Sequence, residues 1–148
     1  MSLLLETINR LGLTLPDTPQ SLGSYMPAKK VGDLIFTAGQ LPTKNGEFLC
    51  KGTLPSNCSI EQAQEGARQC VLNAIAAARS VGEPRGVAKV TCFVASEDGF
   101  TDQPKVANGA SDLLLELFGE AGRHARSAVG VPTLPAGVSV EIEFIFTT

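Results

Sequence analysis

The chain of 148 residues has no tryptophan, a single tyrosine and a single histidine. With so few aromatic side chains, a surface that stacks on nucleic-acid bases is not expected. One histidine is too few for a multi-histidine metal site, and it argues against a Ser-His-Asp triad. The composition therefore argues against a base-stacking surface, a multi-histidine metal site and such a triad.

Charge is also scarce, since charged residues make up 18% of the chain and the net charge is −3. The only basic cluster is Lys29-Lys30. Binding to a phosphate backbone needs a basic stripe, so no nucleic-acid partner is expected. Because a small domain with so few charged residues has a less polar surface, we expect part of that surface to be buried in an oligomer.

No apolar run approaches the ~20 residues that span a bilayer. The N-terminus lacks the basic region and the long apolar region of a signal peptide. We therefore expect no membrane contact and a cytoplasmic protein. The cysteines match no zinc-binding or C-x-x-C spacing, and we expect them to be free, buried thiols: Cys50, Cys58, Cys70 and Cys92.

Apolar residues form 43% of the chain, which suffices for one domain over residues 1–148. Residues 1–24 are expected to form an N-terminal helix and an extended arm. Leu4, Ile8 and Leu11 recur at helical spacing, Gly12 is a typical helix end, and several prolines follow. A buried strand is predicted over residues 34–38, and the turn Asn45-Gly46 leads into a second strand over residues 47–50.

Two longer helices follow. The first begins at the capping box Ser59-Ile-Glu-Gln62 and ends at Gly82, and the second runs from Gln103 to about Phe118. A strand over residues 87–95 separates them. A short turn over residues 134–137 predicts a closing hairpin from Arg126 to Phe146.

This order predicts one sheet with both helices on the same face. The strand over residues 87–95 has apolar residues on both of its faces. A half-solvated sheet alternates more cleanly, and two helices cover only one side. We therefore expect the chain to associate with itself through the sheet.

Arg126 is the leading candidate for chemistry, because it emerges from an apolar segment. In the predicted hairpin it lies near Glu141 and Glu143, which share the face opposite the apolar one. One interpretation is a salt bridge. The other is a guanidinium that binds a substrate carboxylate, beside an acid that orients water.

Other positions are weaker candidates. Gly39 ends the first buried strand, where a ligand could approach the backbone, although a simple turn is equally consistent. Tyr25 lies in the arm, either as an anchor or as a lid over a pocket. Asn108 lies off the apolar stripe of its helix, and His124 is interpreted as structural. No base neighbours the cysteines, which argues against a thiol nucleophile.

Several motifs together carry a resemblance that covers about residues 25 to 146: Gly32-Asp-Leu-Ile-Phe-Thr-Ala-Gly-Gln-Leu-Pro42, Asn108, Ala125-Arg126-Ser127, Leu134-Pro135 and Val140-Glu-Ile-Glu143. With them the sequence resembles the Rid family, also called the YjgF family, whose best-studied members are imine/enamine deaminases. The resemblance implies an α+β, chorismate-mutase-like fold. It also implies a homotrimer that assembles through the sheets, with clefts between subunits.

By position, the resemblance implies that Arg126 holds the substrate carboxylate and that Glu141 positions the hydrolytic water. It gives further substrate contacts at Tyr25, Gly39, Asn108 and Ala128. The implied reaction converts a small 2-imino or 2-enamino acid and water into a 2-oxoacid and ammonia, with no metal or cofactor. The alternative is a trimer that binds small carboxylates without catalysis.

The chain departs from the family pattern at several points. Ala128 stands where many active members have cysteine, and Pro27 replaces a glutamine after the tyrosine. The loop over residues 96–105 is longer than in short members, and residues 1–24 are additional. These features resemble a distinct subgroup with different pocket walls.

Overall fold

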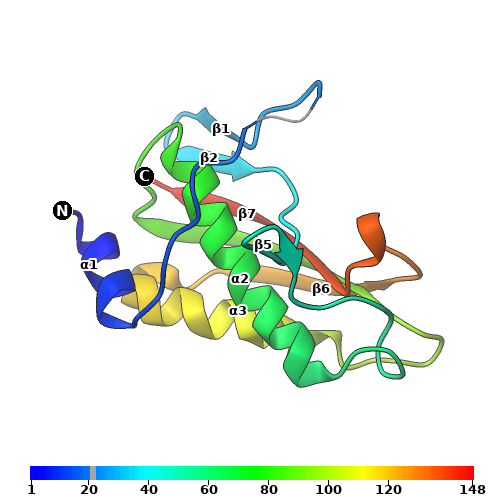
Figure 1. The fold of residues 1–148 in the computed structure, drawn as a ribbon. Helices are drawn as coiled ribbons and strands as arrows, with labels where there is room; N and C mark the ends of the chain where they lie inside the picture. Colours follow the sequence, from blue (N-terminus) through cyan, green and yellow to red (C-terminus); the bar gives the residue numbers. More distant parts are fainter. Residues whose placement is uncertain (21–22) are drawn as a thin grey trace.

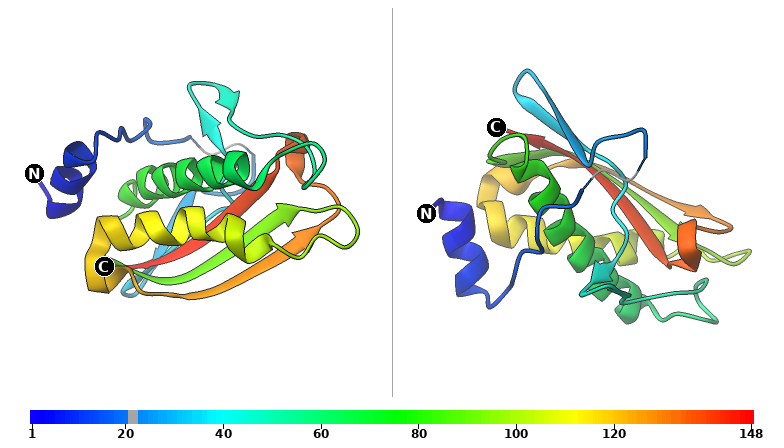
Figure 2. Two further views of the ribbon diagram at one scale, coloured as in Figure 1. Left: turned by 90° about the horizontal axis from the view of Figure 1, so that it is seen from below. Right: turned by 45° about the horizontal axis from the view of Figure 1, so that its top comes forward.

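A computed structural model describes residues 1–20 and 23–148. Its centre is a five-stranded sheet in the order β1-β2-β7-β5-β6, with β5 and β6 parallel and the other neighbours antiparallel. The strands are β1 (Ala28–Val31), β2 (Leu34–Thr37), β5 (Gly86–Ala95), β6 (Ala125–Val131) and β7 (Val140–Thr147). Helices α2 (Ile60–Arg79) and α3 (Gln103–Phe118) lie side by side on one face of this sheet (Figures 1 and 2). The predicted α+β architecture, with one sheet and both long helices on the same face, is confirmed.

The two long helices follow their sequence signals. At the start of α2, the Ser59 hydroxyl accepts from the Gln62 amide, and the Gln62 side chain accepts from the Ser59 amide. This capping box satisfies two backbone donors that the first turn leaves free. Helix α3 has the predicted bounds, and the 3-10 turn Gly119–Gly122 follows it. No helix within the described ranges is both long enough and apolar enough to cross a membrane.

The N-terminal helix α1 (Leu3–Arg10) packs against α3, with Leu4 and Ile8 buried. Gly12 follows it with a positive φ of 71°, the left-handed conformation that favours glycine after a helix. The predicted arm then runs toward the sheet (Figure 1). Residues 21–22 of the arm lie outside the described residues.

Two predictions about the early strands are corrected. The Asn45-Gly46 turn does form a hairpin, but its strands β3 (Thr43–Lys44) and β4 (Glu47–Phe48) form a separate two-stranded sheet. The main sheet instead gains β1, which pairs with β2. Its sequence, Ala-Lys-Lys-Val, carries little apolar signal because it is an edge strand with three exposed residues.

The predicted closing hairpin is wrong, because β5 lies between β6 and β7. After β6 the chain turns through Pro135–Gly137 and enters the sheet between β2 and β5. This central place buries Ile142, Phe144 and Phe146 of β7 beneath the helices, each at most 1% exposed. Burial of these large side chains, and hydrogen bonding on both edges of β7, outweigh the local turn.

The second face of the sheet lies away from both helices (Figure 2). Phe36 of β2 is 41% exposed and Val129 of β6 is 43% exposed. We call this surface the open face. We expected both faces of the sheet to be covered. Within one chain the helices cover one face, and the open face is not covered by them.

Candidate functional site

Arg126 lies on the edge strand β6 with its side chain directed to α3. Its Nη1 donates to Asn108 Oδ1 at 2.8 Å and to Ser111 Oγ at 3.1 Å. Both acceptors lie on α3, three residues apart, and so on one side of the helix. The ion pairs found in the described part of the chain join other residues. The interpretation of Arg126 as a salt-bridge partner of Glu141 or Glu143 is therefore wrong.

A second pair of hydrogen bonds continues from Ser111. The Ser111 hydroxyl lies 2.9 Å from His124 Nε2, and His124 Nδ1 lies 2.6 Å from the carbonyl oxygen of Gly122. Ser111 is buried and His124 is half-buried. We call Asn108, Ser111, His124 and Arg126 the arginine cluster. Sequence reasoning missed Ser111, and it gave His124 no partner, because nothing in the linear pattern links α3 to the start of β6.

Glu141 lies elsewhere in the same chain. Arg126 pairs with Val90 and Val90 pairs with Phe144, whereas Glu141 pairs with Phe93. Paired residues of a sheet point to one face, and positions three apart on a strand point to opposite faces. Because Phe144 faces the helices, Arg126 does so too, and Glu141 faces the open side. One chain therefore does not bring the two predicted catalytic side chains together.

The Glu141 carboxylate rests against Gly39. A Cβ built on Gly39 would lie 2.9 Å from the carboxyl carbon of Glu141 and closer still to Oε2. Glycine is required here by this close approach and not by its φ angle. Burial, and secondarily the charge of Glu143, raise the pKa of Glu141. We call Gly39 and Glu141 the glutamate cluster.

The thiols near these clusters are poor nucleophiles. Burial raises the pKa of Cys92 to about 12, although the nearby charge of Arg126 acts in the opposite direction. Burial likewise raises the pKa of Cys50 to about 11 and that of Cys70 well above its usual value. Only the thiolate attacks. Ala128 pairs with Cys92 on the helix side of β6, so its methyl group packs on the core.

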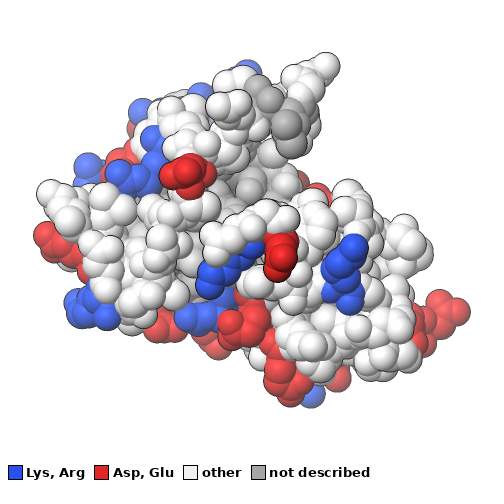
Figure 3. Space-filling model, viewed as in Figure 1, with Lys and Arg blue, Asp and Glu red and all other residues white. Residues whose placement is uncertain are grey.

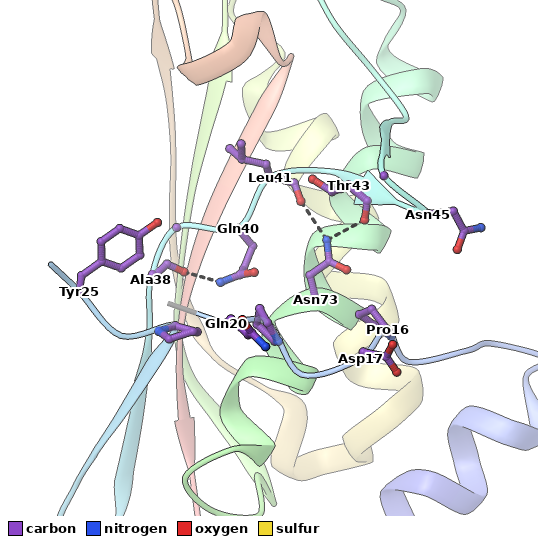
Figure 4. Close-up of a pocket in the computed structure, with 14 residues that line it drawn as sticks. Pro16, Asp17, Gln20, Tyr25, Ala38, Gln40, Leu41, Thr43, Asn45 and Asn73 are labelled. Carbon is purple, nitrogen blue, oxygen red and sulfur yellow. Dashed lines mark hydrogen bonds between the residues drawn. The ribbon is translucent and has the colours of Figure 1, made fainter. Parts of the chain in front are cut away.

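A cavity of about 430 Å³ lies between the N-terminal arm, the segment after β2 and the start of the β3–β4 hairpin (Figure 4). Its lining includes two predicted binding residues, Tyr25 and Gly39. Asn73 of α2 fixes the wall, because its Nδ2 donates to the carbonyl oxygens of Leu41 and Thr43, each at 3.0 Å. The glutamate cluster thus adjoins this cavity through Gly39, whereas Arg126, Asn108 and Ala128 are not among its lining residues.

Charged side chains of both signs lie on the face that carries α2. Figure 3 shows Lys and Arg side chains interspersed with Asp and Glu side chains there. Within the described residues, no three His, Cys, Asp or Glu side chains form a group that could hold a metal ion. One chain therefore offers two separate groups: the Arg126 guanidinium, which is fixed by neutral acceptors, and, on the opposite face of the sheet, the Glu141 carboxylate, whose pKa is raised.

The family model described as "YjgF/chorismate mutase-like, putative endoribonuclease" matches residues 6–147 of this sequence. The chain belongs to this family. Protein TCP17 of Trypanosoma cruzi is 38% identical over 141 residues, which cover 92% of this chain and 88% of that protein. A 2-iminobutanoate/2-iminopropanoate deaminase of Dermatophagoides farinae is 31% identical, over 90% of this chain and 92% of its own.

The crystal structure of Atu1372 from Agrobacterium tumefaciens has the same fold, with a TM-score of 0.89 and 35% sequence identity. The match covers 98% of this chain and 92% of Atu1372. It therefore extends beyond the span of residues 25 to 146 that carries the sequence motifs.

Proposed function

We propose that this YjgF-family protein is an imine/enamine deaminase that hydrolyses small 2-imino or 2-enamino acids to 2-oxoacids and ammonia. The observation that carries the proposal is the arginine cluster, a guanidinium fixed by neutral side chains and not by a carboxylate. Such a cation is available for an anionic ligand, and its planar donors suit a carboxylate. The 31% sequence identity to a 2-iminobutanoate/2-iminopropanoate deaminase supports the same activity.

In the proposed reaction Arg126 binds the substrate carboxylate through its remaining N–H donors. Glu141 accepts a proton from a water molecule as the water oxygen attacks the imine carbon. Glu141 returns this proton to the imine nitrogen, which gives a neutral carbinolamine. Glu141 then takes the proton of the carbinolamine hydroxyl and passes it to the same nitrogen as the C–N bond breaks, which releases ammonia and leaves the 2-oxoacid. A raised pKa suits this role, because such a carboxyl group exchanges protons more readily near neutral pH.

The remaining predicted contacts have supporting places in this scheme. Asn108 orients Arg126, and the backbone at Ala128 continues the same strand. Gly39 leaves room for a ligand against Glu141, and Tyr25 of the arm covers the adjoining cavity. Holding the reactants in this order supplies much of the rate enhancement expected of such a site.

A complete site requires a second copy of the chain, because the two clusters lie on opposite faces of the sheet. We propose a homotrimer that assembles through the open face, in which the arginine cluster of one subunit meets the glutamate cluster of its neighbour. The exposed Phe36 and Val129 supply apolar area for that contact. The outer edge of β6 is also free to receive a neighbour in the described sheet.

The decisive experiment measures ammonia and 2-oxoacid release when 2-aminoacrylate or 2-iminobutanoate is generated in situ. We expect Arg126→Ala to lower kcat/KM about 10- to 150-fold, which corresponds to ~1.5–3 kcal/mol for a charge-assisted contact. Glu141→Gln is expected to lower kcat with a smaller effect on KM. Arg123→Ala is the matched control, because its exposed side chain pairs with Glu120.

Absence of any acceleration by the wild-type chain over the spontaneous rate would exclude these substrates. Full activity in Arg126→Ala would refute the role of Arg126. If 2-oxobutanoate instead binds saturably to the wild type and not to Arg126→Ala, without turnover, the chain is a carboxylate-binding protein.

A further inference from the structure

We propose that Ser111 and His124 are positioning residues that fix the guanidinium of Arg126 for carboxylate binding. This inference rests on the proposed function, which assigns the carboxylate contact to Arg126. It adds two residues that touch Arg126 or its partner and not the substrate. Their hydrogen bonds join α3, the turn after it and the start of β6 into one unit.

The chemistry of the four groups sets the direction of each hydrogen bond. A carbonyl oxygen only accepts, so His124 Nδ1 carries a proton and donates to Gly122. A guanidinium only donates, so Ser111 Oγ accepts from Arg126. The Ser111 hydroxyl proton is then free to point at His124 Nε2, which accepts it when the imidazole is neutral. In each of these three hydrogen bonds the donor therefore lies on the Arg126 side and the acceptor on the Gly122 side.

A series of hydrogen bonds with one direction is cooperative, because each bond polarises the next. The backbone carbonyl of Gly122 anchors one end, and Arg126 Nη1 forms the other. Asn108 takes the second bond from the same Nη1 at 2.8 Å. With Nη1 held twice, the rest of the guanidinium keeps one orientation and is left for a ligand. An arginine without these contacts would lose side-chain freedom only when the ligand binds, which weakens binding.

We call the hydrogen-bonded series from Arg126 through Ser111 and His124 to Gly122 the relay. Matched substitutions separate the contact of His124 with Ser111 from its contact with Gly122. His124→Gln places an amide oxygen near the position of Nε2 and keeps an acceptor for Ser111. His124→Asn places an amide near the position of Nδ1, so that it keeps a donor for Gly122 but loses the acceptor. Ser111→Ala removes the central link. Asp112→Asn is the control, since Asp112 is the exposed neighbour of Ser111 on α3.

We expect Ser111→Ala and His124→Asn to weaken binding of 2-oxobutanoate, measured by calorimetry, about 3- to 10-fold, the effect of one lost hydrogen bond. KM for the imino acid should rise by the same factor, with kcat within about twofold of the wild type. His124→Gln should restore most of the affinity. Equal affinities of wild type, Ser111→Ala and His124→Asn would overturn the proposal.

A second readout does not depend on activity. His124 is the only histidine, so two-bond ¹H–¹⁵N spectra of labelled protein report on it without ambiguity. At a pH where the imidazole is neutral, we expect one protonated and one unprotonated ring nitrogen, with the proton on Nδ1. Ser111→Ala should shift the Nε2 resonance, and Asp112→Asn should not. A neutral imidazole with its proton on Nε2 would refute the relay.

The two hypotheses fail in different ways. If Arg126→Ala binds 2-oxobutanoate as tightly as the wild type, the proposed function is wrong whatever the tautomer. If Arg126→Ala loses binding while the Ser111 and His124 variants keep it, the assignment of Arg126 survives and the relay is wrong.

Discussion

At the scale of single residues, the glutamate cluster depends on one missing side chain. Gly39 lies against the carboxylate of Glu141, and any Cβ there would overlap Oε2. Burial of Glu141 is the first cause of its raised pKa. A carboxyl group in this setting binds a proton more tightly in the folded chain than in the unfolded one. Its ionisation therefore opposes folding.

This gives a prediction for stability against pH. The free energy of unfolding should fall as the pH rises from the unfolded carboxyl pKa of about 4.3 through the higher folded pKa of Glu141. Glu141→Gln removes this titration. We expect the variant to be more stable than the wild type at pH 7. The difference should shrink below pH ~4, where Glu141 is protonated in both the folded and the unfolded wild type.

Urea unfolding at matched protein concentration measures this difference, with the concentration fixed because oligomers unfold by mass action. Glu47→Gln, at an exposed carboxylate in β4, serves as the control. A Glu141→Gln variant that is less stable than the wild type at pH 7 would contradict the assigned cause of the raised pKa.

At the scale of secondary-structure elements, α2 and α3 pack closely at Gly109. A Cβ on Gly109 would lie 2.6 Å from the carbonyl oxygen of Gln64 and 2.8 Å from its Cα. Close to this crossing, Gln64 Nε2 also donates to the carbonyl of Lys105 at 2.8 Å. Gly109 follows Asn108 directly, so the crossing also sets where the arginine cluster lies.

We therefore expect Gly109→Ala to destabilise the fold by about 1–3 kcal/mol, the usual cost of overpacking. Alanine is a better helix former than glycine by ~1 kcal/mol, so propensity alone predicts the opposite sign. Thermal or urea unfolding decides between the two. Asp112→Ala on the exposed side of the same helix should change stability by no more than about 0.5 kcal/mol.

At the scale of the whole molecule, we propose that the open face links assembly to activity. One chain holds the arginine cluster and the glutamate cluster on opposite faces of its sheet. The exposed apolar side chains of the open face are the expected contact between subunits. Loss of assembly should then remove activity even where Arg126 and Glu141 are unchanged.

The test is Val129→Lys, which places a charge on a residue that is 43% exposed on β6. We expect the proposed trimer to dissociate in sedimentation velocity experiments and deaminase activity to fall at least tenfold, because burying an unpaired charge is unfavourable. Leu115→Lys is the matched control, since Leu115 is 41% exposed in α3 on the helix layer. Retained assembly of Val129→Lys would place the subunit contact elsewhere.

The sequence predicted well those elements that depend on interactions between residues close together in the chain. The capping box at Ser59 begins α2, and the bounds of α3 are those predicted. The alternation in β7 identified the side chains that enter the core. Prediction failed for the edge strand β1, because its exposed residues give little apolar signal. It also failed for the strand that separates β6 from β7, because the partners of that strand are distant in sequence.

The sequence by itself determined the helices, the buried strands, the family and the residues Arg126 and Glu141, because spacing and motifs are properties of the chain. Only the tertiary structure decided that these two side chains lie on opposite faces of the sheet, and that Arg126 is held by Asn108 and Ser111. The reason is that strand order follows from burial of the whole core, and a turn of a few residues does not dictate which strands become neighbours.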